Sequence, residues 1–154
     1  MYERRSGELK VLLAHPGGPF YRNKDEGAWT LPKGLAETDE TLEATARREF
    51  REEVGLDAQA PLLALGFVRQ KGGKDVHAWA CEGTFPEQHV LGCNTFAIEW
   101  PPRSGRLQTF PEVDRAQMFT LPEARLKMNA AQTAFLDRLA ALLAVDAGKQ
   151  GSAP

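Results

Sequence analysis

A stripe of apolar residues at helical spacing, closed by a glycine, is the feature that most narrows the fold of this chain. The stripe consists of Leu42, Ala46, Phe50 and Val54. At about 100° of rotation per residue, side chains four positions apart share one helix face. Gly55 follows where a glycine commonly ends a helix in the left-handed conformation. We therefore expect a helix over Asp39 to Val54 with one face against a core.

Three glutamates lie beside this stripe instead of opposite it. Glu49, Glu52 and Glu53 fall near −20°, −80° and +20° from the first stripe residue, at about 100° per residue. Two like charges about 5 Å apart repel by roughly 3 kcal/mol at an effective dielectric near 20. Pairing of Arg48 with Glu52 offsets only about 0.3–0.5 kcal/mol of this repulsion. A divalent cation compensates better, and an all-oxygen donor set favours Mg²⁺ or Mn²⁺ over zinc.

The segment 34–56, GLAETDETLEATARREFREEVGL, resembles the Nudix box of the Nudix (MutT-type) hydrolases. The positions that match are Gly34, Glu40, Arg48-Glu49-Phe50, Glu52-Glu53 and Gly55-Leu56, at the spacing of that motif. The resemblance implies an α/β/α sandwich and an enzyme that uses divalent metal to cleave a nucleoside diphosphate linked to another moiety. The implied chemistry is attack of water on a phosphorus atom.

The same resemblance implies roles for individual residues of the box. Glu49, Glu52 and Glu53 match the metal-binding glutamates, and Gly34 matches a glycine whose carbonyl can be a further metal ligand. Arg48 matches an arginine that orients these acids through salt bridges. Glu40 matches a glutamate that usually has a structural role.

We expect one further carboxylate, Glu112, to complete the catalytic set. It lies in TFPEVDRAQMF, between the turn-prone stretch 101–111 and an expected strand. Nudix enzymes often place a glutamate on such a mobile loop, facing the box helix. There it would ligate a second metal or accept the proton of the attacking water. The catalytic candidates are thus Arg48, Glu49, Glu52, Glu53 and Glu112.

Substrate-binding candidates come from two weaker resemblances to enzymes that act on dinucleoside polyphosphates. AWTLPKG, residues 28–34, places Lys33 where such enzymes often carry a lysine, and KDVHAW, residues 74–79, places Lys74 similarly. Both lysines are candidates for phosphate contact, with plain solvated lysines as the alternative. Trp29 is the best candidate for base stacking, although tryptophans are more often core residues. Ala78 stands where those enzymes tend to carry an aromatic residue.

These signals predict a pyrophosphohydrolase for a nucleoside polyphosphate or dinucleoside polyphosphate. A nucleotide-sugar or ADP-ribose hydrolase is the first alternative within the enzyme class. A Nudix-like domain that binds a nucleotide without catalysis is the alternative from another class. Nudix-like binding domains generally lose box glutamates, whereas all of them are present here, so the costly carboxylate cluster favours an enzyme. A purely structural α+β domain, the third alternative, would leave the cluster without a purpose.

The remaining pattern predicts an α+β fold, with a mixed β-sheet flanked by helices. Further strands are expected over 9–14, 62–69, 75–81, 95–100 and 113–119, and helices over 121–127 and 129–145. Only Met1 and Tyr2 precede a charged turn, so we expect either a clipped first strand or a misassigned start site. We expect a single domain over 1–146 and a flexible tail over 147–154.

Charge and composition exclude several classes of partner. The formal net charge of −2 lacks the positive excess that binding to long nucleic acids requires. The sequence has no run of about 18 apolar residues and no secretory leader, so we expect a cytoplasmic protein without a membrane span. Cys81 and Cys93 have neither disulfide-framework nor zinc spacing, and two buried thiols are expected. We expect a small nucleotide as the binding partner. Whether the protein forms a homodimer is left open.

Overall fold

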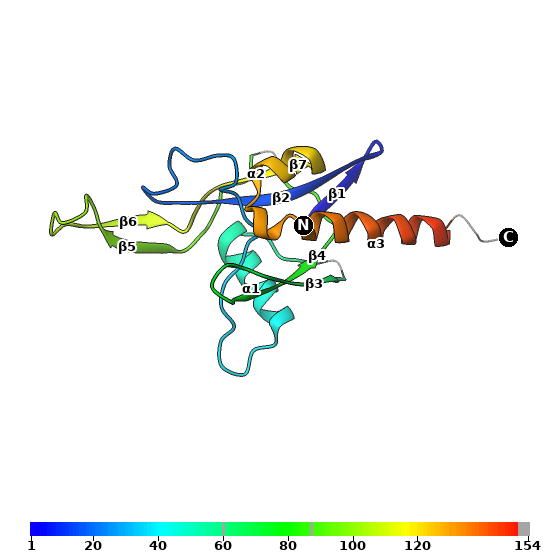
Figure 1. Ribbon diagram of the computed structural model, residues 1–154, viewed down its shortest axis with the longest axis horizontal. Coiled ribbons are helices and arrows are strands. Elements are labelled where there is room, and N and C mark those ends of the chain that lie inside the picture. The colour runs from blue at the N-terminus through cyan, green and yellow to red at the C-terminus, as the bar shows by residue number, and fades with distance from the viewer. Residues whose placement is uncertain (60, 87, 151–154) are drawn as a thin grey trace.

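The strands form three small antiparallel groups in a computed structural model that describes residues 1–59, 61–86 and 88–150 (Figure 1). The first group has the order β1-β2-β7, and its strands are β1 (Tyr2–Arg5), β2 (Glu8–Pro16) and β7 (Val113–Thr120). The other two are the hairpins β3 (Leu63–Arg69) with β4 (Asp75–Ala80) and β5 (Thr95–Glu99) with β6 (Leu107–Pro111).

A parallel bridge joins the β3–β4 hairpin to the three-stranded sheet. The backbone N–H of Tyr2 donates to the Cys81 carbonyl at 2.8 Å, and the Gly83 N–H donates to the Tyr2 carbonyl at 2.9 Å. The chain that leaves β4 therefore runs parallel to β1, whereas all named strand pairs are antiparallel. The expected mixed sheet is confirmed.

Helices cover both faces of this sheet because side chains along β2 alternate in direction. Leu13 packs into a core with Phe135 and Leu139 of α3 (Ala134–Gln150). Leu12, next to it, packs into a second core with Phe50 and Val54 of α1 (Leu42–Val54). The short helix α2 (Leu121–Lys127) covers the α3 side through buried Ala124. The α+β class and the sandwich of helix, sheet and helix are thus as predicted.

The box helix begins later than the sequence predicts, at Leu42 instead of Asp39. The Thr41 side chain caps the helix by accepting from the Ala44 N–H at 3.2 Å. Asp39 has a φ of 66°, which a right-handed helix cannot contain. Leu42 is 46% exposed, so the first residue of the apolar stripe lies outside the core. The core face of the helix starts one turn later.

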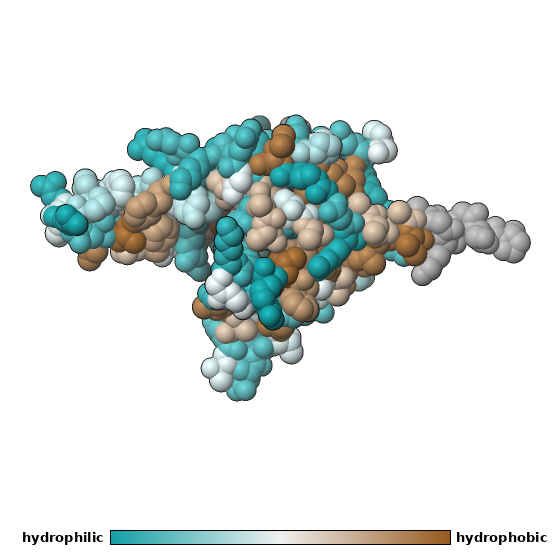
Figure 2. Space-filling model, viewed as in Figure 1, coloured by the Kyte–Doolittle hydropathy of each residue, from teal (hydrophilic) through white to brown (hydrophobic). Residues whose placement is uncertain are grey.

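The sequence also failed to predict two strands. β1 pairs with β2 through a tight turn, so the first strand is present although short. β6 lies within a stretch interpreted as turns, and it pairs with β5 over its whole length. The β5–β6 pair, residues 95–111, projects as an arm from the body of the molecule (Figure 1) and carries apolar residues on its surface (Figure 2).

The C-terminal helix differs from the prediction at both ends. A 3₁₀ turn (Ala130–Gln132) precedes α3 because the Asn129 side chain accepts from the Ala131 N–H at 3.0 Å. The helix then runs to Gln150, into the expected tail, and residues 151–154 lie outside the described part. No helix in the described ranges is long and apolar enough to cross a membrane. Both cysteines are free; Cys81 is buried and Cys93 half-buried.

Candidate active site

Arg48 is the hub of a cluster of glutamates on and before α1. Its Nη1 lies 2.8 Å from Glu49 Oε1 and 3.0 Å from Glu52 Oε2. Its Nε and Nη2 each donate to a carboxylate oxygen of Glu40 at 3.0 Å, and Nη2 also donates to the Leu35 carbonyl. These contacts, with Glu40 foremost, raise the pKa of Arg48 above its ordinary value. One guanidinium therefore holds three carboxylates in position.

Glu40 ties the loop before α1 to the helix. Its carboxylate accepts from the Glu37 N–H at 3.1 Å and from the Thr45 hydroxyl at 2.8 Å, in addition to Arg48. These hydrogen bonds, that of Arg48 first, lower the pKa of Glu40 to about 2. The geometry agrees with a structural function for this residue.

Glu40→Gln should reduce stability at neutral pH and not at pH 2. The folded-state pKa of about 2 lies below the ordinary 4.5, so the contribution is present above pH 4.5 and is lost as the pH falls to 2. Urea unfolding at pH 7, 4 and 2 measures the difference. Glu37→Gln is the control, since its own side chain is exposed. A deficit that persists at pH 2 would contradict this explanation.

Glu53 is the buried member of the cluster, with only 8% of its surface exposed. Its Oε2 accepts from the backbone N–H of Lys33 at 3.1 Å. Burial raises the pKa of the Glu53 carboxyl to about 7; the charges of Glu49 and Glu112 add to the rise, and the Lys33 N–H opposes it. The position beside the apolar stripe thus produces a buried carboxyl, as the helical wheel predicts.

Gly34 lies against the Glu49 carboxylate. A Cβ atom on Gly34 would lie 1.9 Å from Glu49 Oε1 and 2.0 Å from its Cδ, far inside contact distance. Only a residue without a side chain leaves room for the carboxylate there. The loop before α1 therefore packs directly against the helix at Gly34, where its backbone contacts the Glu49 side chain.

Gly34→Ala should displace the Glu49 carboxylate and lower turnover by about a hundredfold, the usual cost of a 1 Å misplacement at a reacting centre. Stability should change little, because the displaced atoms end a flexible side chain. Gly92→Ala is the control, since nothing lies within 4 Å of its added Cβ. The checks are initial rates and thermal unfolding. Full activity in Gly34→Ala would show that the position of Glu49 does not matter.

A cleft of about 400 Å³ opens between the Gly34 loop, α1 and β4. Glu49 and Gly34 border it on one side, and Lys74 on the other. Lys33 borders it as well, together with the aromatic side chains of β4, His77 and Trp79. The Glu49 carboxylate, two lysines and two aromatic rings thus meet in one cleft, which we call the active-site cleft.

A family model described as "NUDIX domain" matches residues 2–139, nearly the whole chain. The chain belongs to the Nudix family. It is a hydrolase that acts on pyrophosphate bonds, and Nudix hydrolases generally need divalent cations.

Several solved structures share the fold of this Nudix hydrolase. An Ap4A hydrolase of C. elegans, in a binary complex, has a TM-score of 0.63 and 21% identity, over 93% of this chain and 92% of that chain. The NUDIX domain of Shewanella oneidensis NrtR, with ADP ribose, has a TM-score of 0.62 and 17% identity, over 92% and 82%. The E. coli ORF135 protein has a TM-score of 0.53 and 24% identity, over 94% and 87%.

Trp29 does not take the stacking position expected for it. Its side chain is 2% exposed and packs edge-on against His15 and Phe119. Its Nε1 donates to Asp25 at 2.8 Å, so even the polar edge is occupied. The alternative, a core tryptophan, is the correct interpretation. His77 and Trp79 offer the aromatic surface in the cleft instead.

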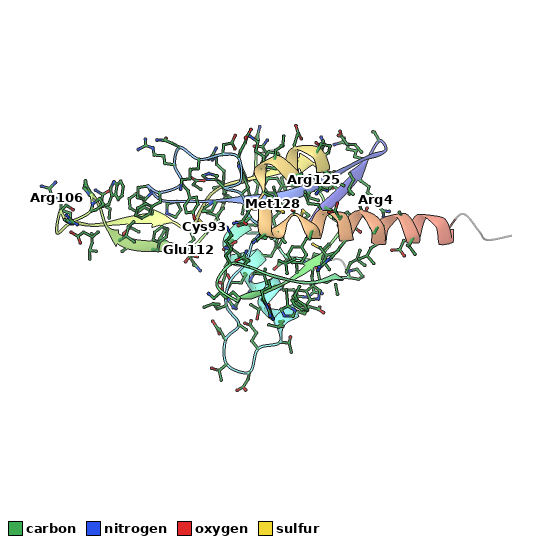
Figure 3. The ribbon with its side chains drawn as sticks, viewed as in Figure 1. Arg4, Cys93, Arg106, Glu112, Arg125 and Met128 are labelled. Atoms are coloured by element: carbon green, nitrogen blue, oxygen red, sulfur yellow. The ribbon has the colours of Figure 1, made fainter. Side chains whose placement is uncertain are left out.

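Glu112 lies at the base of the arm, between β6 and β7 (Figure 3). Its backbone N–H donates to the Asn94 carbonyl and its carbonyl accepts from the Gly17 N–H, both at 2.9 Å. The residue is therefore on an anchored junction, not on the loop that the sequence suggested. Its side chain is exposed, and its charge acts on Glu53.

The donor set of this Nudix site fits a hard divalent cation. Glu49, Glu52 and Glu53 supply only carboxylate oxygens, and the Gly34 backbone packs against one of them. Within residues 1–59, 61–86 and 88–150, no three potential ligands already converge on one point. Arg48 explains this, because it turns Glu49 and Glu52 toward its own nitrogens.

Two buried polar side chains of this Nudix domain are not indicated by any sequence motif. His15 is fully buried, with Nδ1 2.6 Å from Asp114 Oδ1 and Nε2 2.7 Å from the Lys24 carbonyl. Gln132 is also fully buried and accepts from the Leu31 N–H. Neither belongs to a motif, and their partners lie on other segments of the chain, so no local pattern could have revealed them.

Proposed function

We propose that this Nudix hydrolase uses Mg²⁺ or Mn²⁺ to cleave a phosphoanhydride bond in a nucleoside polyphosphate or dinucleoside polyphosphate. One observation carries the proposal: Glu49, a member of the carboxylate cluster of α1, borders a cleft that Lys33 and Lys74 also line. A polyphosphate chain needs cationic side chains along its length and a cation at the scissile bond. The cleft offers two lysines for the chain and, at Glu49, a carboxylate that can hold the cation.

In this proposal Glu49, Glu52, Glu53 and the Gly34 carbonyl hold the cation. When bound, the cation neutralises charge on the diphosphate and makes water more acidic. Arg48 keeps Glu49 and Glu52 in place. Lys33 and Lys74 bind phosphate oxygens and orient the chain.

Glu112→Gln should separate two roles for the carboxylate at the base of the arm. As a general base, Glu112 accepts the proton of the attacking water, and the variant lowers kcat while metal affinity stays nearly constant. As a metal ligand, both fall. Steady-state rates across a Mn²⁺ titration distinguish the two. Wild-type kinetics would remove Glu112 from the site.

A substrate panel tests the proposed function. Nucleoside triphosphates, dinucleoside polyphosphates, nucleotide sugars and ADP-ribose are incubated with the protein and Mg²⁺ or Mn²⁺, and products formed in ¹⁸O-water are identified by mass spectrometry. We expect turnover of a polyphosphate, abolished by EDTA, with ¹⁸O on the attacked phosphorus. Faster turnover of nucleotide sugars or ADP-ribose would favour the first alternative. Binding without turnover of any compound would favour a binding domain.

The proposal also covers the cellular location and the oligomeric state of the protein. We place the enzyme in the cytoplasm. Its net charge of −2 agrees with a free nucleotide as the substrate instead of a long nucleic acid. Light scattering of the purified chain decides between a monomer and a homodimer.

A further inference from the structure

The projecting arm is a sheet of only two strands, so among the described residues β5 and β6 each have one edge without a neighbouring strand (Figure 1). A two-stranded hairpin is marginally stable by itself in water, and a free edge is a template for a further strand. The loop after β2 covers one face of the arm. Gly18 lies against the Phe96 ring there, and the ring centres of Phe20 and Trp100 are 5.4 Å apart. The edges of the arm are exposed.

Two hydrogen bonds at the ends of the arm show which backbone groups point outward. The Glu112 N–H donates to the Asn94 carbonyl and the Trp100 N–H donates to the Arg106 carbonyl, both at 2.9 Å. Pairs in an antiparallel ladder alternate between hydrogen-bonded and non-hydrogen-bonded, so the even-numbered residues of β5 bond to β6 and the odd-numbered ones face away. The free edge of β5 therefore carries the N–H and carbonyl groups of Thr95, Ala97 and Glu99.

The free edges of the two strands differ in what they offer a further strand. On β6 the outward residues are Leu107, Thr109 and Pro111, and proline has no N–H to donate. A proline is one of the devices that close a sheet edge to pairing. The edge of β5 contains no proline and no lysine, and it keeps all its donors. β5 is therefore the edge open to pairing, and β6 is the blocked edge.

The β5 edge is complementary to a second copy of itself. Two antiparallel β5 strands centred on Ala97 pair along their whole length and use every outward N–H and carbonyl group of the strand. Phe96 of one copy then lies opposite Ile98 of the other, and such aromatic and β-branched pairs stabilise sheets. Glu99 lies opposite Thr95, so the two acidic side chains do not meet. The sequence of β5 thus suits an antiparallel copy of β5.

Charge favours the same antiparallel arrangement. The tip of the arm carries the exposed residues Arg103 and Arg106, and the base carries the exposed Glu112 (Figure 3). Antiparallel arms bring each basic tip toward the acidic base of the other arm. Parallel arms would instead bring the basic tips together, and like charges repel.

We propose that two copies of this chain form a dimer through the β5 edges of their arms. The arms then make one continuous antiparallel sheet in the order β6-β5-β5-β6. The blocked β6 strands lie at both outer edges of this sheet, so the contact is isologous and closes at two copies. The pairing ends beside Asn94, whose carbonyl accepts from the Glu112 N–H. The dimer goes beyond the proposed function and does not depend on it.

Sedimentation velocity of the full chain, from about 1 to about 100 μM, tests the proposal by mass action. We expect the wild-type protein to form a dimer. Ala97→Pro removes the central outward N–H and keeps the bonds between β5 and β6, so it should weaken the dimer at least about a hundredfold. Thr109→Pro is the matched control, because it lies directly across the hairpin and faces the blocked edge. It should leave the dimer unchanged.

Ala97→Cys gives a second readout that holds even if Ala97→Pro does not fold. In the paired arms the two Cα atoms at this position lie about 5.5 Å apart, within the range that a disulfide spans. Mild oxidation should therefore link Ala97→Cys into covalent dimers and leave Thr109→Cys unlinked. The native cysteines, Cys81 and Cys93, are common to both variants.

Three results would overturn the proposal. A wild-type protein that stays monomeric at the highest concentration would leave the β5 edge to a strand of another protein. Equal weakening of the dimer by Ala97→Pro and Thr109→Pro, or equal linkage of the two cysteine variants, would place the contact elsewhere. None of these measurements involves turnover, so a negative substrate panel would refute the proposed function and leave the dimer standing.

Discussion

Glu52→Gln and Glu53→Gln should each lower the turnover of the preferred pyrophosphate substrate by a hundredfold or more, because in the proposed function both residues hold the divalent cation. Each change removes one negative charge from the cluster and keeps the size of the side chain. In Glu53→Gln the amide oxygen can still accept from the Lys33 N–H, so local geometry is preserved. Initial rates at saturating Mn²⁺ measure the effect.

The same Glu53→Gln change should stabilise the metal-free protein at pH 8. The folded-state pKa of about 7 lies above the ordinary 4.5, so the wild-type protein loses stability as the pH rises from 4.5 to 7. At about 1.4 kcal/mol per pH unit, the shift corresponds to roughly 3 kcal/mol. Gln cannot ionise and avoids this penalty, so the variant should gain up to that amount at pH 8 and nothing at pH 4.

Together the two measurements separate catalysis from structure. A variant that is inactive and yet more stable has lost a group that serves chemistry at the expense of stability. Urea unfolding in EDTA at pH 4 and pH 8 supplies the second measurement. Glu43→Gln, on the exposed side of the same helix, is the control for both. Retained turnover in Glu53→Gln, or a loss of stability at pH 8, would contradict the role of Glu53.

The sequence predicted the box helix well because spacing alone determines which residues share a face. Glu53 is buried, as its position about 60° from Phe50 on the helical wheel indicates. Glu52 lies about 160° from Phe50 on the wheel and is half-buried where it pairs with Arg48. The start of the helix was less predictable, because Asp39 and Thr41 both suit an N-cap and only the backbone selects one. The spacing of residues in the sequence therefore predicts which face of a helix is buried more reliably than it predicts where the helix begins.

Features that depend on distant partners could not be predicted in this way. β6 follows a stretch rich in Pro, Gly and Ser that suggested turns, and its pairing with β5 is what makes it a strand. Trp29 precedes the box and suggested a stacking surface, but the fold places it between His15 and Phe119. Gln132 gains its significance from the Leu31 N–H, about a hundred positions away in the sequence. In each case tertiary contact, not composition, decides the environment.

Arg48→Met should destabilise the fold and lower turnover by about ten- to a hundredfold, the usual effect of removing a group that orients metal ligands. The Arg48 side chain is 19% exposed and is the shared partner of Glu40, Glu49 and Glu52. Without it, three carboxylates face one another with no countercharge from the chain. Arg48→Lys should restore little, since one ammonium group cannot replace a planar fork that bridges several acids.

Divalent cation should then stabilise Arg48→Met more than it stabilises the wild-type protein. In the variant, Glu49 and Glu52 no longer face a guanidinium, so a cation meets uncompensated charge and binds the folded state more strongly. Thermal unfolding with increasing Mg²⁺ measures the difference. The control is Arg69→Met, whose side chain is 67% exposed and pairs with Asp75 on the β3–β4 hairpin. If Mg²⁺ raises the melting temperature of both variants equally, the cation does not replace Arg48 as the partner of these carboxylates.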